Sequence, residues 1–256
     1  MNIARQAARK IKRMILPAPE VQVRVEHALP TCEARLAHVA SLGYKPGVVF
    51  DCGAFIGRWA QEVHEIFPDA QLILIEPNSE LYPRIAEHTA AFSAQTSLVE
   101  AAVGEKADTM QLNIWENPKH GNETTALAAS SLLGHVQGEA TRRLDVAVRT
   151  IDDICEEHGL LPDLIKLDLQ GAELPALRGA TRALAHCELC IIEFGCLDAY
   201  EHRTTPAQLI AYMERHSFVL YDIVDVRYRP YDSALTGGDF FFIKRSSRLK
   251  KHRDYF

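Results

Sequence analysis

The amino-acid sequence predicts an open α/β fold, with a mostly parallel sheet covered by helices on both faces. Short apolar runs rich in β-branched residues alternate along the chain with segments whose apolar residues recur at helical spacing. Two of these runs end on an aspartate and lead through a glycine turn into a helix. The last two runs, 218–224 and 239–243, have no helix between them, so one strand at that edge can be antiparallel.

The first part of the chain begins with a helix and then alternates strands and helices. Helices are expected at 31–43, 56–67 and 78–88. Thr31 suits an N-cap, Gly43 suits a helix end, and Pro83 lies near a helix start, where proline is tolerated. Strands are expected at 48–51, 71–75, 97–103 and 110–115. The last of these alternates apolar and polar residues, as one strand of a half-exposed hairpin does.

The second part of the chain continues the order. A strand over 146–149 turns into a short helix that Thr150 or Asp152 can cap. Further strands are expected at 163–168, 189–194, 218–224 and 239–243. Helices are expected after Gly171 and after Thr205, which is a suitable N-cap followed by proline.

The first glycine turn lies in the sequence VVFDCGAFIG, residues 48–57. Glycine lets the backbone turn sharply beside a ligand, and α/β folds bind small molecules at the carboxyl ends of parallel strands. A dinucleotide fingerprint would need glycines where Asp51 and Ile56 stand. An acidic residue suits a cationic ligand better, and D-x-G-x-x-x-G resembles the first motif of S-adenosylmethionine-dependent methyltransferases. A purely structural strand–turn–helix is the alternative.

The next two strand ends extend this predicted ligand site. Glu76 ends the second strand, where it is placed to accept both hydroxyls of an adenosine ribose. A surface carboxylate that begins a helix would occupy the same position. Small residues near the end of the third strand, Ala101 and Ala102, would leave room for an adenine ring.

A second strand–glycine–helix unit, DLIKLDLQGAEL, occupies residues 163–174. If its strand lies beside the first, Asp51 and Asp168 share one edge of the sheet. Asp168, Glu173 and Glu193 each lie at or just past the carboxyl end of a strand, and they are the candidates for a general base. Asp168 is equally suited to bind the amino group of a ligand.

Residues 105–141 interrupt the regular order. Long irregular insertions in α/β domains are usually functional or mobile. We expect this insertion to form a loop that covers the substrate. The side chains expected to contact the substrate are His120, Thr124, Ser130, Ser131 and His135. A plain surface loop with solvated histidines is the alternative.

Composition and charge limit the possible partners. The 256 residues carry a net charge of −6, yet residues 1–15 and 244–256 each carry +5, so the body between them is strongly acidic. An acidic body argues against nucleic acid, while the basic ends are either solvated or in contact with an anionic surface. No run of 18 apolar residues exists, and Pro17 interrupts the apolar residues of the N-terminus. We therefore expect a cytoplasmic protein without a transmembrane segment.

The six cysteines are scattered, as expected for reduced thiols in the cytoplasm. Cys187 and Cys190 form a C-x-x-C pair in an expected strand, where residues three apart point to opposite faces. No zinc or redox site is expected there. No other cluster of ligand residues predicts a bound metal.

Residues 31–245 resemble the FkbM family of S-adenosylmethionine-dependent methyltransferases. The segments that carry the resemblance are 48–57, 75–78 (IEPN), 130–132 (SSL), 148–153 (VRTIDD), 163–174 and 177–180 (LRGA). The resemblance implies a Rossmann-like class I methyltransferase fold with a seven-stranded sheet whose last strand is antiparallel. It also implies methyl transfer from S-adenosylmethionine, most often to a hydroxyl of a sugar, glycan or polyketide.

The resemblance also implies the site residues. Cofactor contacts are expected from Asp51, Gly53, Ala54, Phe55, Gly57, Glu76, Pro77, Asn78, Ala101, Ala102 and Asp168. The base would be Asp168, Glu173 or Glu193, with no metal, although some O-methyltransferases use magnesium. The family often has Asn at the position of Phe55 and Glu at that of Gln170. The loss of a charge at 170 argues against a catalytic role for that residue.

Other functions stay open at this point. They are a catalytically inactive binding protein of the same fold, a methyltransferase acting on a non-sugar acceptor, and a nicotinamide dehydrogenase, which the glycine spacing disfavours. The expected organisation is a basic N-terminal extension over 1–30, a methyltransferase domain over 31–245 and a basic tail over 246–256.

Overall fold

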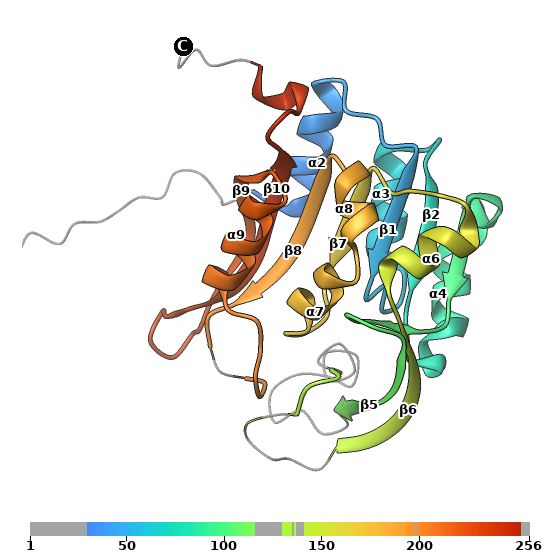
Figure 1. Ribbon diagram of the computed structural model, residues 1–256, viewed down its shortest axis with the longest axis vertical. Coiled ribbons are helices and arrows are strands. Elements are labelled where there is room, and N and C mark those ends of the chain that lie inside the picture. The colour runs from blue at the N-terminus through green and yellow to red at the C-terminus, as the bar shows by residue number, and fades with distance from the viewer. Residues whose placement is uncertain (1–29, 116–129, 135, 137–140, 198, 252–256) are drawn as a thin grey trace, which may run out of the picture.

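The computed structural model describes residues 30–115, 130–134, 136, 141–197 and 199–251. A seven-stranded sheet with the order β3-β2-β1-β7-β8-β10-β9 forms its centre (Figure 1). These strands are β1 (Val48–Cys52), β2 (Gln71–Ile75), β3 (Thr96–Val99), β7 (Leu164–Leu167), β8 (Leu189–Gly195), β9 (Phe218–Tyr228) and β10 (Leu235–Lys244). The pairs from β3 to β8 are parallel, and β10 is antiparallel to both β8 and β9. The predicted α/β fold with one antiparallel strand is confirmed.

Helices cover both faces of the sheet, as Figure 1 shows. They are α2 (Cys32–Ser41), α3 (Arg58–Ile66), α4 (Tyr82–Thr89), α6 (Ile151–His158), α7 (Glu173–Arg178), α8 (Thr181–His186) and α9 (Pro206–Arg215), with short 3₁₀ turns η1 (Ser79–Leu81), η2 (Ala90–Gln95) and η3 (Arg248–Lys250). Side chains of β1 alternate, so Phe50 belongs to the apolar cluster that includes residues of α6 to α9, and Val49 to the cluster that includes residues of α2 to α4. The sheet is thus buried between two apolar layers.

A small second sheet departs from the expected order. The run 97–103, expected to be one strand, is broken at Glu100 and Ala101 into β3 and β4 (Ala102–Val103). β4 leaves the main sheet and pairs with β6 (Thr141–Arg149), which also pairs with β5 (Asp108–Trp115). The expectation of one strand was wrong because apolar patterning does not show where a strand changes partners.

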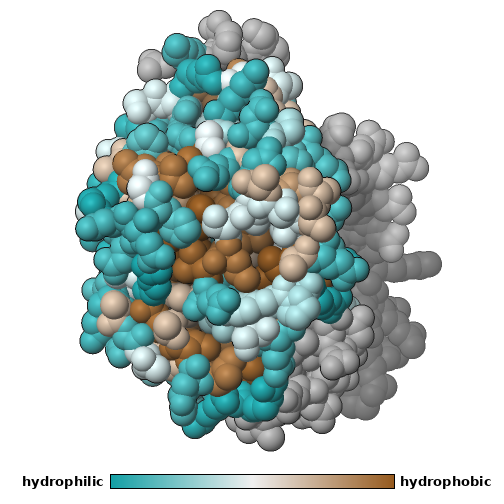
Figure 2. All heavy atoms as spheres, turned by 90° about the vertical axis from the view of Figure 1, so that its right-hand side faces the viewer, coloured by the Kyte–Doolittle hydropathy of each residue, from teal (hydrophilic) through white to brown (hydrophobic). Residues whose placement is uncertain are grey.

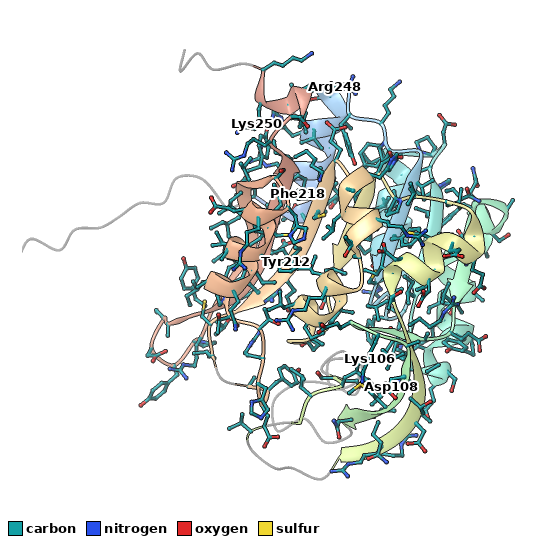
Figure 3. All side chains as sticks on the ribbon, viewed as in Figure 1. Lys106, Asp108, Tyr212, Phe218, Arg248 and Lys250 are labelled. Carbon is teal, nitrogen blue, oxygen red and sulfur yellow. The ribbon has the colours of Figure 1, made fainter. Side chains whose placement is uncertain are left out.

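The two ends of the sheet differ in what surrounds them. In Figure 3, Lys106 and Asp108, close to the start of β5, lie far from Arg248 and Lys250 of η3. The carboxyl ends of the parallel strands face the end at which β5 and β6 lie (Figure 1). Figure 2 shows a lateral face that is mostly hydrophilic, with apolar side chains gathered near its centre.

The C-x-x-C pair is arranged differently from the expectation. Cys187 is the C-cap of α8 and precedes β8, so strand alternation does not apply to it. Its Sγ lies 3.6 Å from that of Cys190, and both residues are buried. Both thiols are free. Within the described ranges, every helix is too short or too polar to cross a lipid bilayer.

Candidate active site

Two glycine turns meet at the carboxyl edge of the sheet. β1 and β7 are neighbours, and the amide of Asp168 donates a hydrogen bond to the carbonyl of Cys52 at 3.1 Å. Gly53 has a φ of +83°, and a Cβ added to it would lie 2.1 Å from the carbonyl oxygen of Asp168. The two turns can pack this closely only because residue 53 has no side chain.

Each turn also contains a non-glycine residue in the left-handed region. Phe55 and Gln170 both have a φ of +52°. Such a conformation is costly for residues with a long or bulky side chain, and it concentrates at functional sites. Both residues line the same pocket. The backbone of each turn is therefore held in place by the structure around it.

A pocket opens between the two turns, the end of β2 and the bend between β3 and β4. Its lining combines small and apolar residues with a few polar side chains. These residues are Gly53, Phe55, Ile75, Glu76, Pro77, Asn78, Leu81, Ala101, Ala102, Val103, Leu112, Ser130, Ser131, Leu132, Asp168, Leu169, Gln170 and Ala172. An apolar pocket with a few convergent polar groups is typical of a small-molecule site.

Glu76 is the carboxylate on the β2 side of the pocket. Its Oε2 accepts a hydrogen bond from the amide of Phe55 at 2.9 Å, and its Oε1 accepts one from the amide of Asn78 at 2.8 Å. Burial raises the pKa of Glu76 to about 7, although both backbone bonds oppose this. The two bonds fix the carboxylate and leave each oxygen a further lone pair for a ligand hydroxyl.

Asp51 lies behind the pocket, on the α3 side of the sheet. It is 2% exposed and is not among the residues that line the pocket. Neither carboxylate oxygen has a hydrogen-bond partner among the described residues, and Oδ1 lies 3.9 Å from the Nζ of Lys166. Burial raises the pKa of Asp51 to about 6, and the Lys166 cation opposes that shift.

Lys166 is a buried cation between two carboxylates. Its Nζ lies 3.1 Å from Oδ2 of Asp168, and it sits 5.4 Å from the centre of the Trp59 ring. Burial alone would lower the pKa of Lys166, but the charges of Asp168 and Asp51 outweigh burial and raise it. Lys166 therefore offsets the negative charges of Asp51 and Asp168 in this part of the sheet.

Asp168 and Glu193 form the polar end of the site, together with Gln170. Nε2 of Gln170 donates to Oδ1 of Asp168 at 2.9 Å and to Oε2 of Glu193 at 3.0 Å. The side chain of Asp168 is 37% exposed, whereas that of Glu193 is 12% exposed. Burial would raise the pKa of Asp168, but the Lys166 cation outweighs burial and lowers this pKa. Burial and the negative charge of Asp168 raise the pKa of Glu193 well above its usual range.

Glu173 supports the second turn from within. It is 1% exposed, and its Oε1 accepts hydrogen bonds from the amides of Leu169 and Gly171 at 3.2 and 2.9 Å. Burial raises the pKa of Glu173 to about 7. It does not line the pocket, so its contacts are those of a residue that holds the 169–171 backbone.

The segment 130–134 closes the pocket on the side of β5. Ser131 and Asn113 exchange two backbone hydrogen bonds, and Oγ of Ser131 donates to the carbonyl of Gln170 at 3.0 Å. The amide of Glu201 donates to the carbonyl of Gly134 at 2.7 Å. This segment is thus fixed to both sides of the pocket mouth. We call it the strap.

The structure brings most of the expected site residues together. Ten of them line the pocket: Gly53, Phe55, Glu76, Pro77, Asn78, Ala101, Ala102, Ser130, Ser131 and Asp168. Asp51, Ala54, Gly57, Glu173 and Glu193 lie outside the lining, and Glu193 reaches it through Gln170. His120, Thr124 and His135 fall outside the described residues.

Sequence reasoning missed three kinds of site residue. Lys166 lies inside an apolar strand, where a lysine is the one unusual residue and could have been noticed. Gln170 stands between Asp168 and a glycine, but nothing in the sequence shows that it bridges two acids. Leu81 and Leu112 follow ordinary helical and strand patterns, so no local signal marks them. In the described part of the chain, no group of three or more His, Cys, Asp and Glu side chains could hold a metal ion.

Comparison with known proteins places this site in a family. The family model described as "Methyltransferase FkbM domain" matches residues 51–220. The 2-O-methyltransferase NoeI of Sinorhizobium fredii (strain NBRC 101917 / NGR234) is 28% identical over 174 residues, which are 64% of this chain and 70% of that protein. The range matched by the family model includes both glycine turns.

Two solved structures are also similar. The methyltransferase FkbM from Methylobacillus flagellatus KT is 21% identical with a TM-score of 0.49, over 76% of this chain and 43% of that one. This chain thus spans less than half the length of the Methylobacillus protein. A putative O-methyltransferase from Klebsiella pneumoniae is 15% identical with a TM-score of 0.48, over 93% of this chain and 95% of that one.

Proposed function

The chain belongs to the FkbM family of methyltransferases, and from that premise we propose that its pocket binds S-adenosylmethionine and that a sugar or glycan hydroxyl receives the methyl group. Support for the first part comes from the pocket itself. A fixed carboxylate, Glu76, faces a lining of alanine, valine and leucine side chains. Such a combination suits a ribose attached to an adenine ring.

The proposal gives each part of the pocket a task. Glu76 accepts the ribose hydroxyls, and the bend at Ala101 and Ala102 leaves space for the adenine ring. The backbone at Gly53 allows close approach of the remainder of the ligand. Asp51 acts from behind this turn through its negative charge, since its side chain does not reach the pocket lining.

Bound S-adenosylmethionine would supply a methyl group made reactive by its positively charged sulfur. The protein then has to exclude water, align the acceptor and remove its hydroxyl proton. Asp168 is the best-placed base because it is the one of the three candidate carboxylates that lines the pocket. Lys166 keeps it ionised at neutral pH, so it can accept a proton. The strap would cover the acceptor.

Sugar-type O-methylation is the finer part of the proposal. The NoeI protein is described as a 2-O-methyltransferase, and its 28% identity over 174 residues supports a hydroxyl acceptor of similar kind. The expectation from the sequence, a sugar, glycan or related compound, points the same way.

Cofactor binding can be tested without an acceptor. Glu76→Gln should weaken binding of S-adenosylhomocysteine about tenfold or more. A carboxylate can accept one ribose hydroxyl on each of its two oxygens, whereas an amide has only one acceptor oxygen. Glu80→Gln is the matched control, since Glu80 is four residues away, exposed and paired with Arg142. Isothermal titration calorimetry measures both variants. Equal affinity in wild type and Glu76→Gln would remove Glu76 from the proposed site.

Acceptor chemistry needs a second experiment. Transfer of a labelled methyl group to a panel of sugars and glycans should identify an acceptor, and replacing its target hydroxyl by hydrogen should abolish labelling. Asp168→Asn should then lower kcat by about 10²-fold or more while S-adenosylhomocysteine affinity changes little. Transfer to nitrogen or carbon acceptors alone would contradict the proposal, and unchanged kcat in Asp168→Asn would exclude Asp168 as the base.

A further inference from the structure

Gln170 occupies an unusual position between two acidic side chains. Its side-chain nitrogen lies 2.9 Å from Oδ1 of Asp168 and 3.0 Å from Oε2 of Glu193. Its side-chain oxygen accepts a hydrogen bond from the hydroxyl of Tyr200 at 3.0 Å. A glutamine amide has two N–H donors and an acceptor oxygen, and here both donors and the oxygen are engaged.

We infer that Gln170 is a positioning residue that allows Asp168 and Glu193 to lie side by side at the pocket, by donating one hydrogen bond to each. Asp168 directly follows β7, Glu193 lies in the adjacent strand β8, and both carboxylates lie within hydrogen-bond distance of one nitrogen. Two carboxylates that close repel one another, and a shared donor offsets part of that repulsion. The catalytic consequence, an ionised Asp168 held toward the acceptor, rests on the proposed function.

The backbone of Gln170 supports the same conclusion. Residue 170 has a φ of +52°, although it is not glycine, and its carbonyl accepts a hydrogen bond from Oγ of Ser131 in the strap. The costly conformation aims the amide at both carboxylates and simultaneously ties the strap to the second glycine turn. One residue thus connects β7, β8, the loop that carries Tyr200, and the strap.

Other charges around the pair have to be considered in any pH experiment. Cations facing it are Lys166 of β7 and Arg227 of β9, and Arg203 of the loop after β8 acts on the neighbouring Tyr200. Acids facing it are Asp51 of β1, Glu76 after β2, Glu173 of α7 and Asp239 of β10. These groups are the same in wild type and in a residue-170 variant. Their effects on the pH dependence of stability therefore largely cancel when the two proteins are compared.

The test is Gln170→Glu, which keeps the shape of the side chain and removes its donors. Three carboxylates would then meet, and their pKa values in the folded state would rise above those of the unfolded chain. A raised folded pKa means stability that is present at low pH and lost as the pH increases through that pKa. The melting temperature of Gln170→Glu should therefore fall below that of wild type by about 3 °C more at pH 8 than at pH 5.

A double variant separates this effect from simple damage to the fold. Gln170→Glu combined with Glu193→Gln moves the amide to position 193, where it can donate to residue 170 and its oxygen can still accept from Arg227. The additional loss at pH 8 should become smaller, because two carboxylates then meet instead of three. Gln71→Glu, at the exposed start of β2, makes the same chemical change without neighbouring acids in the pocket and should show a pH-independent difference.

The possible outcomes are distinct. A loss of stability in Gln170→Glu that is equal at pH 5 and pH 8, or one that the double variant leaves unchanged, would overturn the inference. S-adenosylhomocysteine binding, measured on the wild-type protein by calorimetry, reports separately on the proposed function. Absence of such binding would refute the proposed function without affecting the conclusion from the pH experiment.

Discussion

Substitution of Gly53 by alanine tests the closest contact in the site. Gly53 has a φ of +83°, and its added Cβ would lie 2.1 Å from the carbonyl oxygen of Asp168. Alanine in the left-handed region costs about 1–2 kcal/mol. Moving a packed backbone carbonyl to relieve the overlap costs roughly another 1–3 kcal/mol. Gly53→Ala should therefore lose about 2–5 kcal/mol of unfolding free energy.

Gly43→Ala is a matched control within the same chain. Gly43 has a φ of +87°, but nothing lies within 4 Å of its added Cβ. This variant should show only the conformational cost, about 1–2 kcal/mol. Urea denaturation followed by circular dichroism gives both values on one scale. If Gly53→Ala loses no more stability than Gly43→Ala, the two glycine turns are not packed as described.

Three further perturbations follow from the buried charges and the backbone. Lys166→Met leaves Asp51 and Asp168 without their cation and should lower the free energy of unfolding by about 3 kcal/mol at pH 8. The loss should be smaller at pH 5, because protonation removes the charge of the carboxylates. An equal loss at both pH values in urea denaturation would contradict this. In the wild type, the pKa values of Glu76 and Glu173 are raised to about 7, so their contribution to stability is complete below about pH 4 and is lost as the pH rises through 7. Unfolding free energy should hence decrease from pH 5.5 to about 8, and an increase would show that these carboxyls are not buried as described. At residue 55, where φ is +52°, Phe55→Gly should be about 1 kcal/mol more stable than Phe55→Ala in the same denaturation assay; an alanine variant as stable as the glycine variant would show that this backbone is not strained.

The sheet and the first site motif could be predicted because they depend on local patterns. The apolar run 48–50 is followed by Asp51, Cys52 and Gly53, and parallel strands place such ends at one edge. Placement of Glu76, Ala101 and Ala102 around one pocket follows from the same rule. These residues could be predicted because strand order determines which chain segments become neighbours.

Side-chain direction could not be predicted in the same way. Asp51 lies one residue inside β1, and strand alternation turns it toward α3, away from the pocket. Glu173 is a candidate base from its position after a strand, and the sequence gives no sign that its Oε1 accepts hydrogen bonds from two backbone amides. The role of Gln170 depends on Glu193 and Tyr200, which are 23 and 30 residues away. Local sequence patterns do not show which residues so far apart in the chain come into contact.

The strap is attached mainly through its main chain. Ser131 exchanges backbone hydrogen bonds with Asn113, and Gly134 accepts one from the amide of Glu201. Main-chain bonds do not depend on which side chains the segment carries. Substitutions at Ser130 or Leu132 can therefore change the chemistry of the pocket mouth while the path of the strap stays the same. If the proposed function holds, acceptor choice can diverge without any rearrangement of the sheet that supports the strap.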